Sequence, residues 1–224
     1  MKATVIITSY NRPHLLPQAV DSALNQKYDN IQIIIADDGS NEETRKVCED
    51  YNAKYDNITY YQSDRKDEDR LKSTEFAENI NACIPLIEGE IVFYLTDDDY
   101  YYPNHVSEIM SAFKEHPDWM MAYGPQKQNK YDDDTGEEWT AFIRAPGYKV
   151  SQASCQLDHN QVAHRKSVFD IVGGWPTEPE HRGAGDAAMW VKINAHWPAY
   201  RATDQITNVH RHHRDSIQGP VVWP

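Results

Sequence analysis

The sequence has few cysteines and a shortage of positive charge. Its three cysteines, Cys48, Cys83 and Cys155, lie far apart and form no CxxC motif and no zinc-type Cys/His spacing, so we expect no structural zinc site. There are 22 Lys and Arg residues against 35 Asp and Glu residues, a formal net charge of −13. A chain this acidic repels a nucleic-acid backbone and an anionic membrane surface, which argues against either as its main partner.

Long apolar runs and glycine-rich phosphate loops are also missing. No apolar stretch approaches the roughly 20 residues of a membrane span, and no secretory signal precedes the first strand. Because scattered cysteines in odd number are typical of reduced thiols, we expect a cytoplasmic protein without a transmembrane segment. Neither GxxxxGK nor GxGxxG occurs, which argues against a P-loop and a dinucleotide-type Rossmann site.

The first half of the chain alternates apolar strands with helices. Short runs rich in β-branched and aromatic residues predict strands at residues 3–8, 31–36, 58–61 and 91–95. Apolar residues recur at helical spacing after Pro13, and further helices are expected from Asn41 and over residues 73–87. Strands that alternate with helices pair in parallel through crossover connections. We therefore predict an α/β fold with a mostly parallel central sheet flanked by helices.

This alternation weakens in the second half. A helix is expected from Pro103 to about Glu115, short strands and loops over residues 120–165, and another helix near Gly185. At 224 residues the chain is long enough for one substantial core but short for two full domains. We predict a single domain over residues 1–224.

Acidic residues cluster after two of the predicted strands. Asp37 and Asp38 follow the second strand, and Asp97, Asp98 and Asp99 follow the fourth. Open α/β sheets bind ligands at the carboxyl ends of their strands, and adjacent carboxylates repel one another unless a cation or strong hydrogen bonds offset the repulsion. Oxygen ligands suit Mg²⁺ or Mn²⁺, which take one or two carboxylates together with phosphate oxygens and water. The alternative is an acidic turn that caps the next helix.

Three further groups of residues are open to two interpretations. Asp186 follows two nearby glycines at the start of a predicted helix, where it is either a helix N-cap or a general base. The His- and Arg-rich stretch at residues 209–216 binds phosphate or completes a metal shell, or it is a solvated loop. Arg65 and Arg70, in the polar loop after the third strand, face either a phosphate or water.

Taken in order along the chain, these motifs resemble the family 2 inverting glycosyltransferases of the GT-A fold. The matching segments are VIITSYNR at residues 5–12, DDGS at 37–40 and TDDD at 96–99. The nearest likeness is to a spore coat polysaccharide synthesis enzyme of that family. It extends to DGSNEET at residues 38–44, YQSD at 61–64, DH at 158–159, VAHR at 162–165 and GDA at 185–187. The resemblance implies the GT-A (nucleotide-diphospho-sugar transferase) fold, with a nucleotide-binding half at residues 1–102 and an acceptor-side half at residues 103–224.

The resemblance also assigns roles to single residues. It implies that the nucleotide is bound by Thr8, Tyr10, Arg12, Asp38, Arg70, Asp97 and Asp98. Within this set Tyr10 would stack on a uracil- or thymine-type base, and Asp38 would read the edge of that base. Asp98 or Asp99 would hold the metal, with His213 as a further ligand, and Asp186 would be the catalytic base.

The implied activity is transfer of a sugar, with inversion of configuration, from a UDP- or dTDP-linked donor to an acceptor hydroxyl. Mg²⁺ or Mn²⁺ would be the cofactor, and a hexosyltransferase of this kind would serve polysaccharide or glycoconjugate synthesis. One rival is a sugar-1-phosphate nucleotidyltransferase, which needs a Gly-rich basic loop where SYNRP stands at residues 9–13. Another is a nucleotide-sugar or glycan-binding module without catalysis, and the intact carboxylates at 97–99 and 186 count against it.

Overall fold

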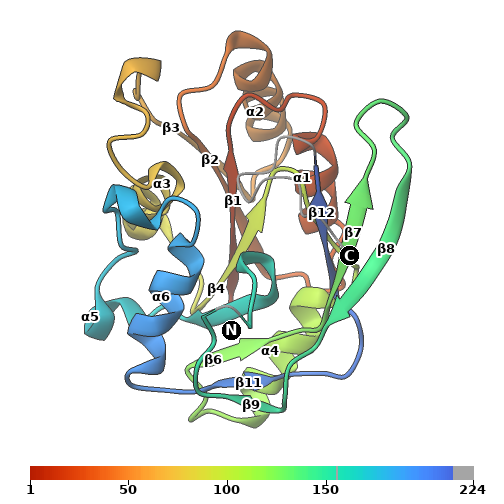
Figure 1. The fold of residues 1–224 in the computed structure, drawn as a ribbon, viewed down its shortest axis with the longest axis vertical. Helices are drawn as coiled ribbons and strands as arrows, with labels where there is room; N and C mark the ends of the chain where they lie inside the picture. Colours follow the sequence, from red (N-terminus) through yellow and green to blue (C-terminus); the bar gives the residue numbers. More distant parts are fainter. Residues whose placement is uncertain (155, 214–224) are drawn as a thin grey trace.

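The computed structural model describes residues 1–154 and 156–213, which form a large mixed sheet, a smaller sheet and surrounding helices (Figure 1). Within these residues the large sheet has the strand order β3-β2-β1-β4-β10-β6-β11-β9. Its strands are β1 (Ala3–Ser9), β2 (Ile31–Asp37), β3 (Ile58–Gln62), β4 (Ile91–Thr96), β6 (Met121–Tyr123), β9 (Lys149–Val150), β10 (Val162–Arg165) and β11 (Ala199–Arg201). The first half of the chain therefore supplies the long, regular strands.

Strands β1 to β4 pair in parallel, as the sequence predicts. The crossover helices are α1 (Leu16–Leu24), α2 (Glu42–Lys54) and α3 (Glu75–Cys83). β1 lies between β2 and β4 with Ser9 beside Asp37 and Thr8 beside Thr96. This register brings the ends of the three strands to one level, and the acidic segments that follow β2 and β4 lie side by side as a result.

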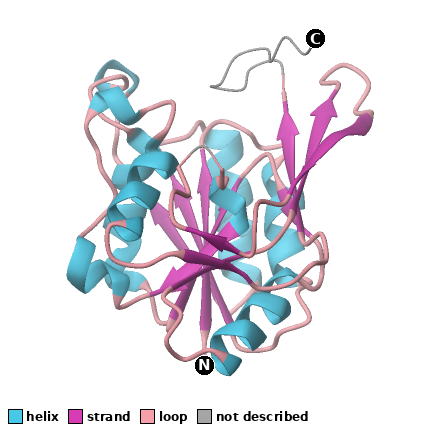
Figure 2. Cartoon of the chain, turned by 60° about the horizontal axis from the view of Figure 1, so that its bottom comes forward, coloured by secondary structure: helices cyan, strands magenta, loops and turns pink. Residues whose placement is uncertain are grey.

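Apolar cores fill both faces of the large sheet, which helices cover on each side (Figure 2). Ile33 and Ile35 of β2 belong to one core, and Ile34 and Ala36 belong to the other. All four side chains are fully buried, and burying a residue as large as Ile contributes about 1.5–3 kcal/mol. Burial on both faces explains why β1 and β2 are continuous apolar runs rather than alternating ones.

The helix expected over residues 73–87 is shorter than predicted. α3 ends at Cys83, and a short 3₁₀ helix, η2 (Ile84–Leu86), takes its place. Pro85 has no N–H for an α-helical hydrogen bond, so the α-helix stops before it. The remaining helices are α4 (His105–Glu115), α5 (Val168–Val172), α6 (Gly185–Asn194), η1 (Asp67–Asp69), η3 (His159–Gln161) and η4 (Pro179–His181). Helices α4 and α6 confirm the predictions after Pro103 and near Gly185.

The smaller sheet comes mostly from the second half of the chain. Its strands, in spatial order, are β5 (Tyr100–Tyr101), β12 (Asn208–His212), β7 (Gln126–Tyr131) and β8 (Glu138–Arg144). β12 contains most of the described part of the His- and Arg-rich stretch, so that part is a strand between two neighbours and not the solvated loop considered above. The end of that stretch, 214–216, and Cys155 lie outside the described residues.

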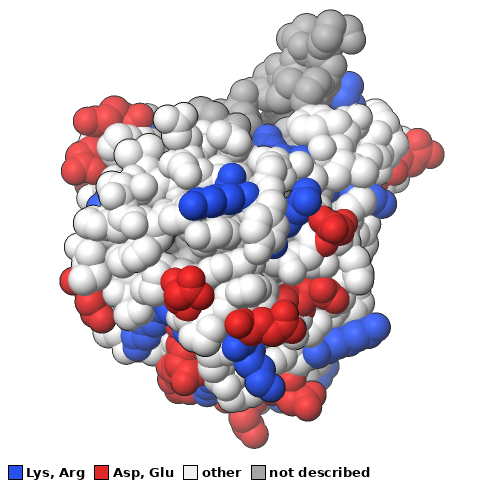
Figure 3. Space-filling view, turned by 90° about the horizontal axis from the view of Figure 1, so that it is seen from below, with Lys and Arg blue, Asp and Glu red and all other residues white. Residues whose placement is uncertain are grey.

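The underside of the molecule carries charges of both signs. Figure 3 shows basic side chains standing among acidic ones on this face. The net charge of −13 is therefore not gathered there into one acidic surface. Within the described ranges, no helix has both the length and the apolar character that crossing a bilayer requires.

Candidate active site

A cavity of about 480 Å³ opens at the carboxyl ends of β1, β2 and β4, where an open α/β sheet binds its ligand. Residues from both halves of the chain line it, among them Thr8, Tyr10, Arg12, Asp38, Arg70, Asp97, Asp98, Asp158, Asp186 and His210. The structure thus brings together every residue predicted to bind the nucleotide and the predicted base Asp186. Among the described residues the lining does not include Asp99 or His213, the other two predicted metal ligands.

Two arginines, Arg65 and Arg70, hold the carboxylate of the cavity-lining residue Asp38. The Arg70 guanidinium lies on the Tyr10 ring, 3.2 Å from the ring centroid, and its Nη1 and Nη2 are each 2.6 Å from Asp38 Oδ2. Arg65 Nε donates to Asp38 Oδ1 at 2.8 Å. Burial raises the pKa of Asp38, and Arg65 and Arg70 oppose that rise. The position of the Arg70 guanidinium, on the Tyr10 ring and beside Asp38, therefore suits a planar group that carries N–H donors.

Arg12 joins the two carboxylates that face the cavity. Arg12 Nη1 is 3.2 Å from Asp97 Oδ1 and also donates to Asp98 Oδ2. Asp97 accepts further hydrogen bonds from Ser9 Oγ at 2.9 Å and from the Tyr10 backbone N–H at 3.0 Å. Burial and the charge of Asp98 raise the pKa of Asp97, whereas Arg12 lowers the pKa of Asp98 in spite of its burial. A positive group between two buried carboxylates marks a position that suits a divalent cation.

Asp99 is enclosed by hydrogen-bond donors. Its side chain is fully buried, and Oδ2 accepts from Thr96 Oγ1 and His210 Nδ1, each at 2.8 Å, and from Asn160 Nδ2. Oδ1 accepts from the Arg211 backbone N–H at 2.6 Å. Asp99 therefore connects the turn after β4 to η3 and to β12.

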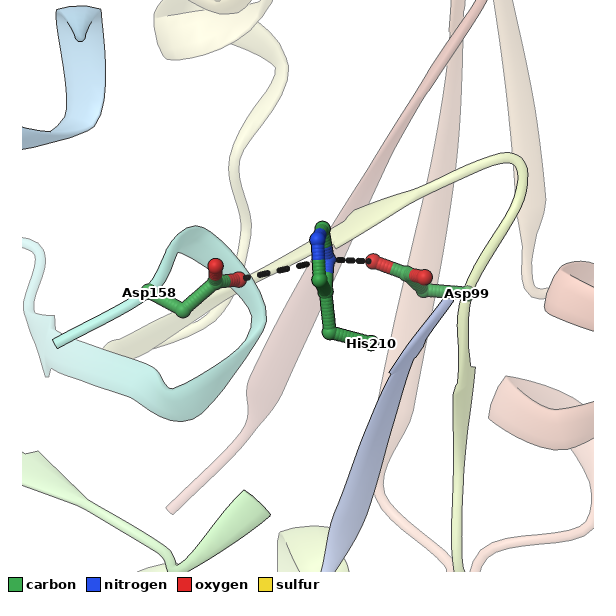
Figure 4. A group of neighbouring side chains, drawn as sticks. All are labelled: Asp99, Asp158 and His210. Atoms are coloured by element: carbon green, nitrogen blue, oxygen red, sulfur yellow. Dashed lines mark hydrogen bonds and ion pairs between the residues drawn. The ribbon is translucent and has the colours of Figure 1, made fainter. Parts of the chain in front are cut away.

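Asp99, Asp158 and His210 form a cluster in which the imidazole lies between two carboxylates (Figure 4). His210 Nδ1 is 2.8 Å from Asp99 Oδ2 and 3.9 Å from Asp158 Oδ1. Burial disfavours a charged imidazole, but the two carboxylates outweigh burial and raise the pKa of His210 to about 10. One donor atom from each residue lies within 4.8 Å of the others. Carboxylate oxygens with one imidazole nitrogen are a donor set that fits a divalent cation such as Mn²⁺.

His213, the histidine assigned to the metal by resemblance, lies outside this cluster. Its Nδ1 is 2.9 Å from Asp133 Oδ1, in the turn between β7 and β8, and its ring packs against Tyr131 with centroids 4.6 Å apart. Side chains alternate along a strand, so His210 and Arg211 of β12 point to opposite faces. His210 is thus the histidine that hydrogen-bonds Asp99, whereas the charge of His213 helps to lower the pKa of Asp98.

Asp186 lies inside the first turn of α6. The helix begins at Gly185 with Ala184 as the N-cap residue, so the N-cap interpretation of Asp186 is wrong. A Cβ at Gly185 would lie 2.6 Å from the Phe76 ring, which explains the glycine just before the acid. Asp186 Oδ1 accepts from the Ala187 backbone N–H at 2.7 Å. Burial and the nearby charge of Asp158 raise the pKa of Asp186 to about 6, and a cavity-facing carboxylate with such a pKa is suited to general base catalysis.

Asp158 and His210 were not singled out as site residues, although His210 lies in the stretch at residues 209–216 for which a phosphate or metal role was considered. Asp158 caps η3 in a capping box with Gln161, and Arg144 Nη1 lies 3.5 Å from its Oδ2. The Asp-x-x-Gln spacing could have revealed the cap but not the cavity beside it. If residues 208–212 are taken as a strand, their side chains point alternately to the two faces of the sheet. That alternation would have shown that His210 and Arg211 point in opposite directions.

The α/β sheet with carboxylates at its strand ends agrees with the class predicted from the sequence, the GT-A glycosyltransferases. The family model of glycosyl transferase family 2 matches residues 4–169 of the chain. Protein CgeD of Bacillus subtilis (strain 168) is 33% identical over 226 residues, an alignment that covers 94% of this chain and 52% of CgeD. The chain belongs to glycosyl transferase family 2, and it spans about half the length of that curated relative.

Solved structures share this fold at low sequence identity. Staphylococcus aureus TarS 1–349 in complex with UDP-GlcNAc has a TM-score of 0.75 and 17% identity, covering 97% of this chain and 60% of TarS 1–349. The mannosyltransferase PcManGT from Pyrobaculum calidifontis, in complex with GDP-Man and Mn²⁺, has a TM-score of 0.63 and 18% identity, covering 93% of this chain and 56% of its own. These likenesses confirm the predicted GT-A fold.

Proposed function

We propose that the protein is an inverting, metal-dependent glycosyltransferase that moves a hexose from a UDP- or dTDP-linked donor to an acceptor hydroxyl in polysaccharide or glycoconjugate synthesis. The observation that carries this proposal is a single cavity lined by Tyr10 and Asp38, by Asp97 and Asp98, and by Asp186. An aromatic face, a pair of carboxylates and a base are the groups that such a transfer needs. The UDP-GlcNAc complex of TarS supports a UDP-linked donor. The GDP-Man and Mn²⁺ complex of PcManGT supports, more broadly, a nucleoside-diphosphate sugar with a divalent cation.

The donor would be held mainly by residues of the first half. Tyr10 offers an aromatic face to the base, and Asp38 offers an acceptor to a ring N–H, which uracil and thymine both carry. Asp97, beside the Tyr10 backbone, would accept from a ribose hydroxyl. Arg12 and Arg70, two of the arginines that line the cavity, would approach the diphosphate.

Asp98 and the cluster of Asp99, Asp158 and His210 are the residues that would hold the divalent cation. A bound cation supplies charge neutralisation on the departing diphosphate. Asp98 would exchange its contact with Arg12 for the cation, and His210 would lose a proton to become a ligand. The cation site thereby couples the first half of the chain to β12.

In the transfer step Asp186 takes the proton from the acceptor hydroxyl. The acceptor oxygen attacks the anomeric carbon on the face opposite to the diphosphate and forms the new C–O bond. The bond between the anomeric carbon and the diphosphate oxygen breaks at the same time, and its electron pair leaves with the diphosphate. Attack from the opposite face inverts the configuration, and Arg12 and Arg70 stabilise the negative charge that gathers on the leaving group.

Calorimetric titration with UDP, dTDP, GDP, ADP and CMP, first with Mn²⁺ and then with EDTA, tests the donor site. We expect UDP or dTDP to bind tightly with Mn²⁺ and to lose affinity in EDTA. Absence of any metal-dependent nucleoside-diphosphate binding would contradict the roles of Asp38, Asp97 and Asp98. Pyrophosphate release from a nucleoside triphosphate and a sugar phosphate would favour a nucleotidyltransferase, and metal-dependent binding without hydrolysis or transfer would favour a binding module.

A further inference from the structure

Arg65 is a buried cation that the proposed transfer does not use. Its side chain is 10% exposed, and each guanidinium nitrogen has a partner: Nε donates to Asp38 Oδ1 at 2.8 Å, Nη1 to Ser73 Oγ at 3.3 Å, and Nη2 to Glu78 Oε2. Among the described residues, the cavity lining contains Asp38 but not Arg65. Arg65 is therefore fixed behind Asp38 and reaches the cavity only through that carboxylate.

Gly39 permits this close approach. A Cβ at Gly39 would lie 2.5 Å from the Arg65 carbonyl oxygen, and the φ of Gly39 is +69°, a conformation that residues with a Cβ rarely adopt. The glycine after Asp38 thus lets the loop that carries Arg65 lie directly against the turn that carries Asp38. The pairing of Arg65 with Asp38 follows from the backbone of both segments as well as from their charges.

The two oxygens of Asp38 have different surroundings. Arg65 occupies Oδ1, whereas Oδ2 accepts from Arg70, whose guanidinium lies flat on the cavity-lining Tyr10 ring. The Arg70 guanidinium is a planar group with N–H donors, stacked on an aromatic ring and directed at Oδ2. A nucleobase with a ring N–H has the same shape and the same donor, so it can take this position in place of Arg70.

We propose that Arg65 is a positioning residue that sets the base specificity of the donor site. By holding Oδ1 it keeps Asp38 an ionised, acceptor-only group with Oδ2 beside Tyr10. This geometry selects bases whose ring nitrogen donates, namely uracil, thymine and guanine, over cytosine and adenine, whose corresponding nitrogens accept. The inference rests on the proposed function, because it concerns the nucleotide of the same donor site.

Loss of Arg65 would remove both the orientation and the charge balance of Asp38. Asp38 would keep contacts with Arg70 and Asn79 but would lose the one that fixes Oδ1, and the effect of burial, which raises the pKa of Asp38, would lose its main opposing contact. A protonated carboxyl can donate to cytosine, so the distinction between the two kinds of base would fade. A lysine at this position would restore a point charge but not the fork of three donors.

The test compares wild-type protein with Arg65→Gln and Arg65→Lys, and uses Lys66→Gln as the matched control. Lys66 is exposed and lies in the same loop. Its substitution by Gln removes one positive charge, as Arg65→Gln does, but does not remove a contact with Asp38. Calorimetry measures the affinity for UDP and CDP in Mn²⁺, and for Mn²⁺ with pyrophosphate, which has no base. In Arg65→Gln we expect UDP affinity to fall roughly 10- to 100-fold, the preference for UDP over CDP to disappear, and pyrophosphate affinity to stay unchanged.

Arg65→Lys should regain part of the UDP preference, and Lys66→Gln should behave like the wild type. An equal loss of UDP and CDP affinity with the preference intact would overturn the proposal, as would an unchanged Arg65→Gln protein. Loss of pyrophosphate binding in both Arg65 variants would also overturn it, because Arg65 would then support the whole site. A wild-type protein that binds no nucleoside diphosphate is a separate outcome, which defeats the proposed function itself.

Discussion

Asp186 is the residue that we propose as the catalytic base. Burial and Asp158 raise the pKa of its carboxyl to about 6, and only the ionised carboxylate can accept the acceptor proton. We therefore predict that kcat/KM rises with pH through about 6, as the carboxyl loses its proton, and levels off at higher pH. Initial rates over a pH series at fixed Mn²⁺ check this prediction. A flat profile across that range would contradict the assignment.

Replacing the Asp186 carboxylate tests whether this residue acts in catalysis and not in nucleotide binding. Asp186→Asn should lower turnover by roughly 10²- to 10⁴-fold and remove the rise near pH 6, while UDP affinity stays close to the wild-type value. Asp118→Asn, at an exposed aspartate remote from the cavity lining, is the control and should keep full activity. Near-wild-type turnover in Asp186→Asn would rule out its role as base.

The neighbouring carboxylates Asp98 and Asp99 should respond differently to the same substitution. Asp99 is fully buried and pairs with His210, so Asp99→Asn should lower the free energy of unfolding by about 3–5 kcal/mol even in EDTA. Asp98 faces the cavity and pairs with the more exposed Arg12, so Asp98→Asn should cost less stability and should weaken Mn²⁺-dependent UDP binding. Urea unfolding in EDTA measures the first effect, and equal losses would contradict the distinction.

At the scale of elements, the sequence predicts secondary structure best in segments whose own residues carry a regular apolar pattern. The buried strands β1, β2 and β4 and the helices between them were predicted correctly, because each has its own apolar periodicity. The exception is the end of α3, because the helix predicted over residues 73–87 includes Pro85 and the observed α-helix ends at Cys83. The sequence also predicts that the acidic segments lie near one another, because parallel strands have their carboxyl ends at the same edge of the sheet.

Strand β12 shows why the rest of the site was harder to predict. Its two neighbours, β5 and β7, are distant in sequence, and nothing within residues 208–212 reveals these partners. His210 is charged in the cluster because Asp99 and Asp158 come to it from two other segments. Asp38 and Arg65 show the same difficulty, since a single arginine in a polar loop carries no sign of the carboxylate it will meet.

At the scale of the whole molecule, we expect a chain with a net charge of −13 to need a cation in order to bind a diphosphate. Ligand that binds only the folded state at 100 times its Kd adds about 2.7 kcal/mol of stability, which for a chain of this size raises Tm by roughly 5–10 °C. We predict this rise for UDP with Mn²⁺ and little change for UDP in EDTA. Tryptophan fluorescence during heating reports it, because Trp175 and Trp190 are buried. An equal rise in EDTA would contradict metal-dependent binding.

The hydrogen bonds to Asp99 have a consequence for how the protein is made. Two of its partners, His210 and Arg211, are 111 and 112 residues further along the chain. On the ribosome, strands β1 to β4 emerge and can pair long before β12 has been synthesised. A nascent chain can thus have paired strands β1 to β4 while Asp99 still lacks its two partners from β12, His210 and Arg211. The proposed cation site is completed only when β12 arrives, so a growing polypeptide would not transfer sugar before that point.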